Sequence, residues 1–275
     1  MHSQFVYNKV AIKNGIIGYL KYGQGHSLIM LPRYAATLYN WDYELIETLA
    51  QKFTVYLFDT RLIGHSYSTN DETIDGYVDD IKQAIDALEL NPSIVAGWSF
   101  GGVVVQKLYK AYPENIAGLI MISSFPDPKY VNPEFVALSM RPNSELTDEE
   151  KNRLYQLMVS EFPSNDLPNR LRQNVLKITN YDFRYTVEAK YLHNKFILTC
   201  LPSTAEDLAA IRVPCLILNA KNDLSFSSLA YEEFIKNIPQ CKLILYPRGG
   251  HLLIHHHGKE IAYDIINYFE NNITK

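Results

Sequence analysis

The stretch Val95-Ala96-Gly97-Trp98-Ser99-Phe100-Gly101-Gly102 decides the fold of this chain. A short run with β character precedes a Gly-x-Ser-x-Gly pattern, and an apolar run suited to a helix follows it. A strand, a tight turn and a helix in this order are what a strained nucleophile turn requires. The pattern predicts that Ser99 is exposed at the turn and that the backbone N–H of Phe100 faces a developing oxyanion. A glycine-rich loop without function is the alternative, so a base and an acid must be found elsewhere.

The composition is that of a globular chain with a sizeable core. Its 275 residues are 47% hydrophobic and 20% charged, which suits one large α/β domain or one domain with an insert. A net charge of -4 without a basic, aromatic-rich run argues against nucleic-acid binding. No apolar segment approaches the ~20 residues that span a bilayer, and the N-terminus lacks a signal-peptide pattern. Three scattered cysteines predict reduced thiols, a cytoplasmic protein and no metal site.

Strand-like and helix-like runs alternate on both sides of a long interruption. This alternation predicts a mainly parallel central sheet with helices on both faces. Residues 126–203 contain only helical signals and predict an all-helical cap, inserted into a core made of residues 1–125 and 204–275. The cap helices are expected at three apolar stripes: Leu154 to Phe162; Leu171, Val175 and Ile178; and Val187, Tyr191 and Phe196.

Four separate stretches resemble the α/β-hydrolase superfamily with a helical cap. Residues 97–102 resemble its nucleophile elbow, and Asp59-x-Arg61-x-x-Gly64-x-Ser66 resembles its Asp-x-Arg-Gly-x-Gly-x-Ser loop. Asn219-Ala-Lys-Asn-Asp223 is similar to its acid loop, and Gly249-Gly250-His251 is similar to its histidine turn. The likeness covers nearly the whole chain except the insert. It implies the α/β-hydrolase fold, a serine nucleophile, and neither a metal nor an organic cofactor.

The resemblance implies a triad of Ser99, Asp223 and His251 in the chain order of that fold. A serine hydroxyl is a poor nucleophile at neutral pH, and histidine, with an ordinary pKa of ~6.5, is a suitable base. A carboxylate must hold the imidazole in the right tautomer and stabilise its cation. Asp127, after the preceding core strand, is the alternative acid, and we favour Asp223.

The other histidines have simpler interpretations. His65 lies in the Asp59–Ser66 loop, where a structural role is expected, and His193 is expected at the surface or in the lid. His255, His256 and His257 are adjacent, and three adjacent side chains cannot face one metal on a helix. We interpret this triplet as a polar segment that leads into the last helix.

The loop after the strand that ends at Leu31 departs from the superfamily pattern. Many relatives carry His-Gly there, and this chain has Pro32-Arg33. The backbone N–H of Tyr34 is the expected second oxyanion donor beside that of Phe100, because a backbone donor tolerates a change of side chain. Arg33 could place a positive charge near the pocket, and an exposed or Asp-paired arginine is the interpretation that we favour.

An apolar pocket decorated with hydroxyl groups is expected above Ser99. Its candidate lining residues are Arg33, Trp98, Phe125 and Tyr130. Such a pocket suits a small or medium, largely apolar carboxylic ester as a small-molecule substrate. A homodimer is compatible with the sequence, and neither nucleic acid nor membrane is an expected partner. The same triad supports C–C bond hydrolysis, lactone opening and perhydrolysis, and a non-catalytic ligand receptor on this fold is a further alternative.

Overall fold

The computed structural model of the protein describes residues 4–160, 167–173, 175–181, 185–227 and 229–272. Within these residues one sheet has the strand order β10-β9-β7-β6-β3-β4-β2-β1-β8, with β5 paired to β2. The strands are β1 (Gln4–Ile12), β2 (Gly15–Gly23), β3 (His26–Leu31), β4 (Phe53–Phe58), β5 (Tyr67–Ser68), β6 (Ser93–Trp98), β7 (Ile116–Ile122), β8 (Lys177–Thr179), β9 (Cys215–Ala220) and β10 (Cys241–Tyr246). The strands from β10 to β4 are parallel to their neighbours, whereas β2 is antiparallel to β4 and β1.

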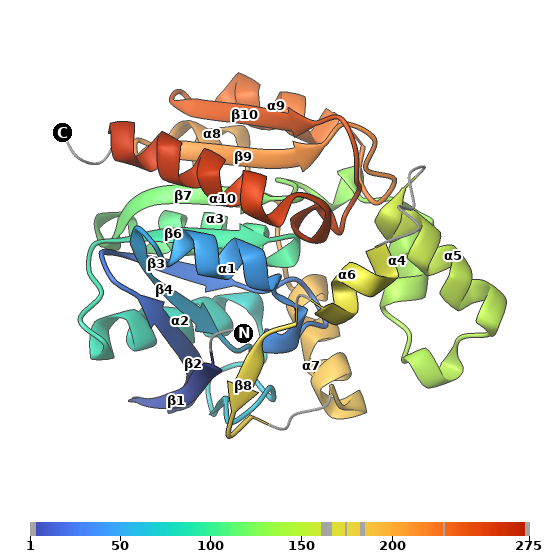
Figure 1. The fold of residues 1–275 in the computed structure, drawn as a ribbon, viewed down its shortest axis with the longest axis horizontal. Coiled ribbons are helices and arrows are strands. Elements are labelled where there is room, and N and C mark those ends of the chain that lie inside the picture. Colours follow the sequence, from blue (N-terminus) through green and yellow to red (C-terminus); the bar gives the residue numbers. More distant parts are fainter. Residues whose placement is uncertain (1–3, 161–166, 174, 182–184, 228, 273–275) are drawn as a thin grey trace.

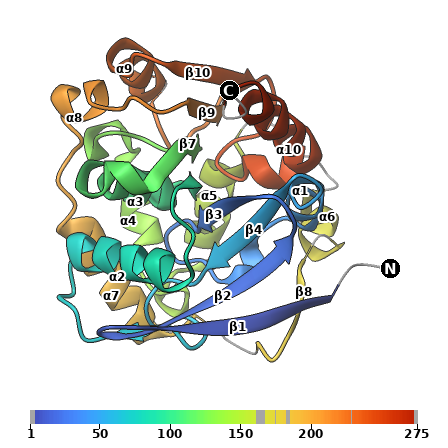
Figure 2. The same cartoon turned by 90° about the vertical axis from the view of Figure 1, so that its left-hand side faces the viewer.

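Helices cover both faces of this sheet (Figure 1). On one face, α1 (Tyr43–Leu49) packs against α10 (Leu253–Asn272). The opposite face carries α2 (Ile74–Ala87), α3 (Phe100–Ala111), α8 (Ala205–Ala209) and α9 (Leu229–Asn237). The edge-on view in Figure 2 separates the two layers of helices. The arrangement confirms the predicted α/β fold with a mostly parallel sheet.

The central strands are buried on both faces, which explains their composition. Every residue of β6 and β9 is buried, and six of the seven residues of β7 are buried. Parallel strands covered by helices on both sides are read as continuous apolar runs rather than as alternating patterns. This is why these strands could be predicted from short runs of valine, isoleucine and leucine.

A further group of helices lies beyond the carboxyl ends of the parallel strands, at the right of Figure 1. These are α4 (Pro133–Ser139), α5 (Asp148–Val159), α6 (Leu167–Gln173) and α7 (Val187–Leu198). The loops after β3, β6, β9 and β10 leave the sheet at the same end, because parallel strands share one carboxyl edge. Side chains on these loops can therefore meet the α4–α7 group.

The segment 126–203 is not all-helical, which corrects the prediction. The helix expected to span Leu171, Val175 and Ile178 ends at Gln173, and β8 follows it. Ile178 lies opposite Phe5 of β1, and the Thr179 hydroxyl donates to the Phe5 carbonyl over 3.0 Å. Ile178 and Thr179 are β-branched and suit a strand, and the free edge of β1 offers them a partner.

The helix predicted around Val187, Tyr191 and Phe196 is present as α7, but the predicted buried stripe is wrong. Val187 and Tyr191 are about half exposed, at 46% and 54%, whereas Phe196 is buried. The buried face also carries Lys190 and His193. An apolar pattern fails to predict the inner face of this helix because that face contacts polar groups of the core.

Candidate active site

Ser99 sits at a strained turn between β6 and α3. Its backbone has φ +57° and ψ −118°, a conformation that residues with a Cβ rarely adopt. The turn is tight enough that a Cβ on Gly97 would lie 2.1 Å from the carbonyl carbon of Gly101. A Cβ on Gly101 would lie 2.3 Å from the carbonyl oxygen of Leu31. Glycine at both positions therefore lets the turn close and pack against the end of β3.

Asp223 and His251 follow the ends of β9 and β10 and are both buried. The Nδ1 atom of His251 lies 3.7 Å from Oδ2 of Asp223, a separation longer than a hydrogen bond. Among the described residues, neither of these two atoms has a hydrogen-bond partner. The second carboxylate oxygen of Asp223 accepts from the backbone N–H of Ser225 over 2.8 Å. The carboxylate is thus oriented toward the imidazole from one side.

Asp127, the alternative acid, is engaged elsewhere. Its carboxylate accepts from the backbone N–H of Lys129 over 2.9 Å and lies 3.2 Å from the ammonium of the same residue. It caps a short 3-10 helix (Pro128–Tyr130) that follows the loop after β7. This geometry makes Asp127 a turn-capping residue and leaves Asp223 as the carboxylate beside His251.

The loop after β3 faces the elbow with two backbone donors available. Among the described residues, no acceptor takes a hydrogen bond from the backbone N–H of Tyr34 or of Phe100. Ala35 has φ +57°, a left-handed conformation that normally favours glycine. The loop thus keeps a left-handed turn without a glycine. The Tyr34 side chain is held by a hydrogen bond from its hydroxyl to Asn194 of α7.

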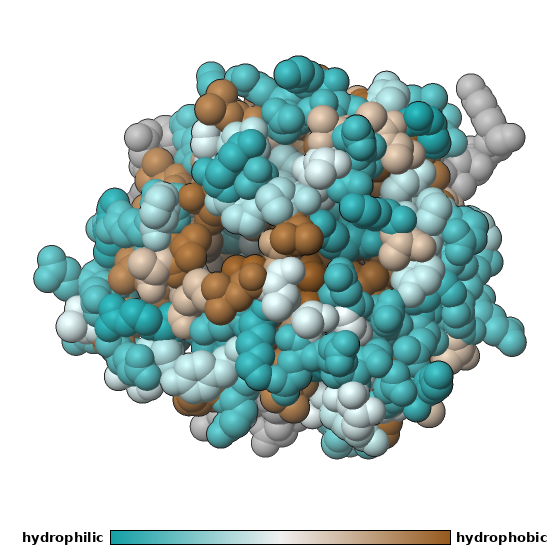
Figure 3. All heavy atoms as spheres, turned by 180° about the vertical axis from the view of Figure 1, so that it is seen from behind, coloured by the Kyte–Doolittle hydropathy of each residue, from teal (hydrophilic) through white to brown (hydrophobic). Residues whose placement is uncertain are grey.

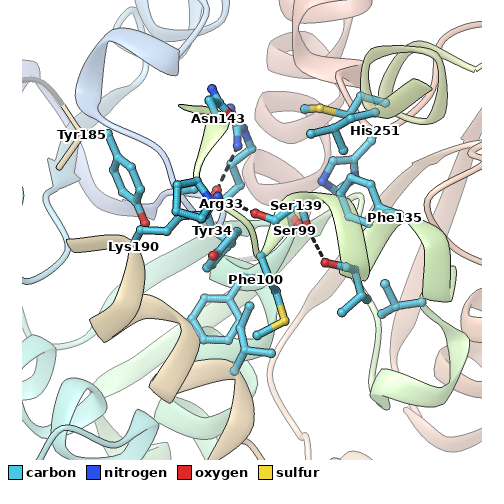
Figure 4. A pocket seen from close by; sticks show the side chains of 18 of the residues that line it. Arg33, Tyr34, Ser99, Phe100, Phe135, Ser139, Asn143, Tyr185, Lys190 and His251 are labelled. Carbon is cyan, nitrogen blue, oxygen red and sulfur yellow. Dashed lines mark hydrogen bonds between the residues drawn. The ribbon is translucent and has the colours of Figure 1, made fainter. Parts of the chain in front are cut away.

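A pocket of about 490 Å³ opens above Ser99, between the core loops and the helices α4, α5 and α7. Ser99, Phe100, Tyr34 and His251 line it together with mostly apolar side chains. In the close view of Figure 4, Ser99 lies between His251 and Phe135 on one side and Arg33, Tyr34, Tyr185 and Lys190 on the other. A cavity of this size suits a small-molecule ligand. Figure 3 shows a hollow with apolar side chains at its rim on the back of the molecule.

Two of the four predicted lining residues, Arg33 and Phe125, line this pocket, and two do not. Trp98 is buried behind the site, where its indole N–H donates to the His251 carbonyl over 3.0 Å. Successive residues of a strand point to opposite faces, which separates Trp98 from Ser99. Tyr130 lies outside the pocket, with its hydroxyl 3.4 Å from a Glu233 carboxylate oxygen.

Arg33 is not exposed and pairs with no aspartate among the described residues, contrary to our favoured interpretation. It is partly buried, and its guanidinium carbon lies 5.2 Å from the ring centroid of Trp98. One guanidinium nitrogen donates to the carbonyl of Tyr34 over 2.8 Å. Burial lowers the pKa of Arg33 to about 10. The residue remains charged at neutral pH, within the loop after β3.

Residues 28–257 match the model of the family described as serine aminopeptidase, S33. The chain belongs to this family of α/β-hydrolases. A pimeloyl-[acyl-carrier protein] methyl ester esterase of Nitrosomonas europaea is 27% identical over 83% of this chain and 90% of its own length. A bifunctional esterase/perhydrolase of Acinetobacter calcoaceticus is 24% identical over 84% of this chain and 87% of its own. A proline iminopeptidase of Flavobacterium johnsoniae is 22% identical over 83% of this chain and 84% of its own length.

Solved structures agree with this α/β-hydrolase fold. An α/β-hydrolase fold protein from Chitinophaga pinensis has a TM-score of 0.81 at 20% identity, covering 96% of this chain and 97% of that one. A thermophilic esterase from Thermogutta terrifontis has a TM-score of 0.76 at 18% identity, covering 96% and 98%. The chain is therefore a hydrolase whose relatives include esterases and peptidases. Within the described residues, no helix is both long and apolar enough to cross a membrane.

His193 of this α/β-hydrolase, expected at the surface or in the lid, is buried in α7, so the surface alternative is wrong. Its Nε2 lies 2.9 Å from the carbonyl of Arg61, and its Nδ1 lies 2.8 Å from the hydroxyl of Tyr185. A carbonyl only accepts, so Nε2 carries the proton and Nδ1 accepts from Tyr185. Burial lowers the pKa of His193 to about 4, so the ring is neutral at physiological pH. His193 joins α7 to the core.

The remaining histidines do not form a metal centre in the part of the chain that the structure describes. His65 is exposed on its loop. The triplet lies inside α10 rather than before it, and the backbone is non-helical at His257. His255 is buried with Nδ1 3.6 Å from a carboxylate oxygen of Asp42. His255 and His256 thus belong to the first turn of α10, and His257 marks a kink in the helix.

Sequence reasoning did not predict Phe226 and Lys190 beside the site, whereas Phe135 and Tyr185 belong to the aromatic residues of segment 126–203, of which a minority was expected to line the pocket. The rings of Phe135 and Phe226 contact the imidazole of His251 edge to face, at centroid distances of 5.3 and 4.9 Å. Lys190 and Tyr185 also line the pocket. Phe135 lies in the segment predicted to cover Ser99, and this was a usable signal. Lys190 gave none, because a lysine within a helix is normally solvated.

The carboxyl end of α5 contacts both the acid loop and the histidine turn. The Ser160 hydroxyl accepts from the backbone N–H of Leu224 over 3.1 Å, and the Ser225 hydroxyl donates to the Leu157 carbonyl over 3.1 Å. The backbone N–H of Leu252, next to His251, donates to the Met158 carbonyl over 3.2 Å. One helix end therefore holds the neighbours of Asp223 and of His251.

Proposed function

We propose that this protein is a carboxylic-ester hydrolase that works through an acyl-enzyme on Ser99. The observation that carries the proposal is a strained Ser99 that opens into the same pocket as His251, with Asp223 directly behind the imidazole. A nucleophile, a base and an orienting acid in this order are the requirements of two-step acyl transfer.

The proposed reaction begins when Ser99 attacks the ester carbonyl and His251 takes the hydroxyl proton. The backbone N–H groups of Phe100 and Tyr34 stabilise the resulting oxyanion, and His251 protonates the leaving alcohol. Water, activated by the same imidazole, then hydrolyses the acyl-enzyme. Asp223 holds the imidazole in its tautomer and stabilises its cation, so no metal or organic cofactor has a role in these steps.

The charges of the pocket favour an ester over a peptide with a free amino terminus. Such a peptide carries an ammonium group, which an aminopeptidase must bind with acceptors or carboxylates. The described lining of the pocket holds no aspartate or glutamate, and its two cationic side chains are Arg33 and Lys190. These would repel an ammonium group.

We also infer that residues 126–203 act as the cap of this enzyme. Helices α4, α5 and α7 of that segment supply one wall of the pocket, and the core loops supply the other. Mostly apolar side chains on both walls exclude water from the acyl group. The cap thereby limits the substrate to one of small or medium size.

A fluorophosphonate probe and a panel of p-nitrophenyl esters of rising acyl length test the proposal. We expect the probe to label the wild-type protein and not Ser99→Ala, and esterase activity to disappear in the same variant. Absence of labelling in the folded wild-type protein would overturn the acyl-enzyme mechanism. If labelling occurs but only a lactone, a vinylogous diketone or peroxide-dependent turnover is seen, the ester assignment is wrong.

A further inference from the structure

Two cationic side chains from different elements meet in the wall of the pocket. Arg33 comes from the loop after β3, and Lys190 comes from the inner face of α7. The ammonium of Lys190 lies 5.1 Å from the ring centroid of Tyr34, whose backbone carbonyl binds Arg33. Figure 4 shows both residues on the side of Ser99 that is opposite His251. They are therefore separate from the base and the acid.

Within the part of the chain that the structure describes, no carboxylate neutralises either cation. Among the described residues no carboxylate forms an ion pair with Arg33 or Lys190, and their polar partners are carbonyl oxygens of Tyr34 and Ser139. Burial, with a further contribution from Arg33, lowers the pKa of Lys190 to about 8. Two like charges in an apolar pocket repel each other. An anion bound between them is attracted by both cations and relieves this repulsion.

The guanidinium of Arg33 has donors left for such an anion. Its Nη1 is used on the Tyr34 carbonyl, its Nε is buried without an acceptor, and its Nη2 donates to no described residue. The Nη2 group can therefore donate to an oxygen of a carboxylate. The Trp98 ring, with its centroid 5.2 Å from the guanidinium carbon, forms a cation–π contact on one side of the group. Lys190, which uses one donor on Ser139, has two more.

We propose that the pocket recognises a second, non-reacting carboxylate of the substrate through Arg33 and Lys190. The preferred substrate is thus a monoester of a dicarboxylic acid, with its ester carbonyl at Ser99 and its free carboxylate at the cationic wall. The apolar side chains between them accommodate the connecting methylene chain. This inference rests on the proposed function for the identity of the reacting group, but the anion site itself does not require turnover.

Matched pairs of esters test the inference. Each pair consists of the mono-p-nitrophenyl ester of a dicarboxylic acid and the same ester with a terminal carboxamide, which has equal size and no charge. A series of chain lengths locates the distance from Ser99 to the cations. At the best length we expect the carboxylate to raise kcat/KM by about 10- to 100-fold over the carboxamide, the range of a hydrogen bond to a charged group.

Three variants identify the residues responsible. Arg33→Met and Lys190→Met should each reduce the carboxylate-to-carboxamide ratio, and Arg33→Gln provides a second replacement if the first does not fold. Lys195→Met is the matched control, because Lys195 lies on the same helix, pairs with Glu72 and does not line the pocket. Its ratio should equal that of the wild type. If Arg33→Met lowers both esters equally, Arg33 acts on the reacting carbonyl or the loop, and the inference is wrong.

Binding to Ser99→Ala separates this inference from the proposed function. Calorimetric titration with the monomethyl ester of the best dicarboxylic acid should give tighter binding than titration with its terminal amide. Preferential binding without hydrolysis by the wild type would overturn the esterase proposal and leave the anion site standing. Hydrolysis of both esters at equal rates would overturn the anion site and leave the esterase standing.

Discussion

At the scale of single residues, the site depends on side chains that gain a role from the backbone beneath them. Ser99 is presented by a left-handed turn that only the neighbouring glycines allow to close. Asp223 faces His251 while one of its oxygens accepts from the backbone N–H of Ser225. These positions could be predicted because glycine, serine and aspartate at strand ends form patterns that few other structures need.

Asp223→Asn should reduce kcat/KM by about 10³- to 10⁴-fold, because the amide can no longer stabilise the imidazolium or select its tautomer. Asp127→Asn removes only a turn cap and a surface ion pair, and should change kcat/KM by no more than about twofold. Steady-state hydrolysis of one p-nitrophenyl ester by both variants measures the difference. The opposite order of effects would assign the acid to Asp127.

Arg33 shows what a residue pattern could not predict. Its position in the oxyanion loop was clear from the sequence, and its partner was not. The cation–π contact with Trp98 and the hydrogen bond to the Tyr34 carbonyl depend on how β6 and the loop after β3 meet in space. Trp98 itself was assigned to the pocket because it adjoins Ser99, although the alternation of side chains along β6 turns it away.

At the scale of elements, α7 departs most from its predicted form. Its inner face carries Lys190 and His193, and its outer face carries Val187 and Tyr191. Amphipathic patterns identify a buried face only where the surface beneath it is apolar. The surface beneath α7 presents the Arg61 carbonyl and the Tyr185 hydroxyl, which His193 satisfies. The presence of α7 could therefore be predicted, and its orientation could not.

Neutral His193 predicts that α7 loses stability in acid. The pKa of His193 is about 4 in the folded protein and near 6.5 in the unfolded chain, so the unfolded state binds more protons between these values. The stabilisation is fully present above pH 6.5 and decreases as the pH falls, and the loss reaches about 3 kcal/mol by pH 4. Urea unfolding of the wild type and of His193→Gln at pH 7.5 and pH 5 measures it.

The informative quantity is the difference between the two proteins, because other buried groups also titrate. Burial raises the pKa of Asp59 to about 8, which acts on stability in the opposite direction and is common to both proteins. The free energy of unfolding should fall more steeply with acid in the wild type than in His193→Gln. Equal slopes would mean that His193 is already charged in the folded state.

At the scale of the whole molecule, the fold follows from local signals that agree with one another. Continuous apolar strands, capped helices and glycine turns all point to the same layered arrangement, and the structure confirms it. The β8 strand is the exception, because its three residues have no strong pattern of their own. It forms because the edge of β1 is available. This pairing joins Gln4 to Lys177, two residues that are far apart in the sequence.

The three cysteines predict a simple thiol titration. Cys200, Cys215 and Cys241 are free, and burial raises the pKa of each thiol, to about 11 for Cys200. We expect slow reaction with a thiol reagent in the native protein at pH 7.5 and rapid reaction of all three thiols in urea. Cys215 and Cys241 are opposite each other on adjacent strands. Labelling of a single thiol in urea would therefore indicate a disulfide between them.

The hydrogen bonds at the carboxyl end of α5 couple the opening of the pocket to the arrangement of the site. The same few residues of α5 hold the loop of the acid and the turn of the base, and α5 also lines the pocket. A displacement of α5 that admits bulk water would release both loops at once. In the proposed mechanism, Ser99 is therefore reactive only while α5 contacts both loops. When α5 is displaced and water enters the pocket, Asp223 and His251 lose their supports together.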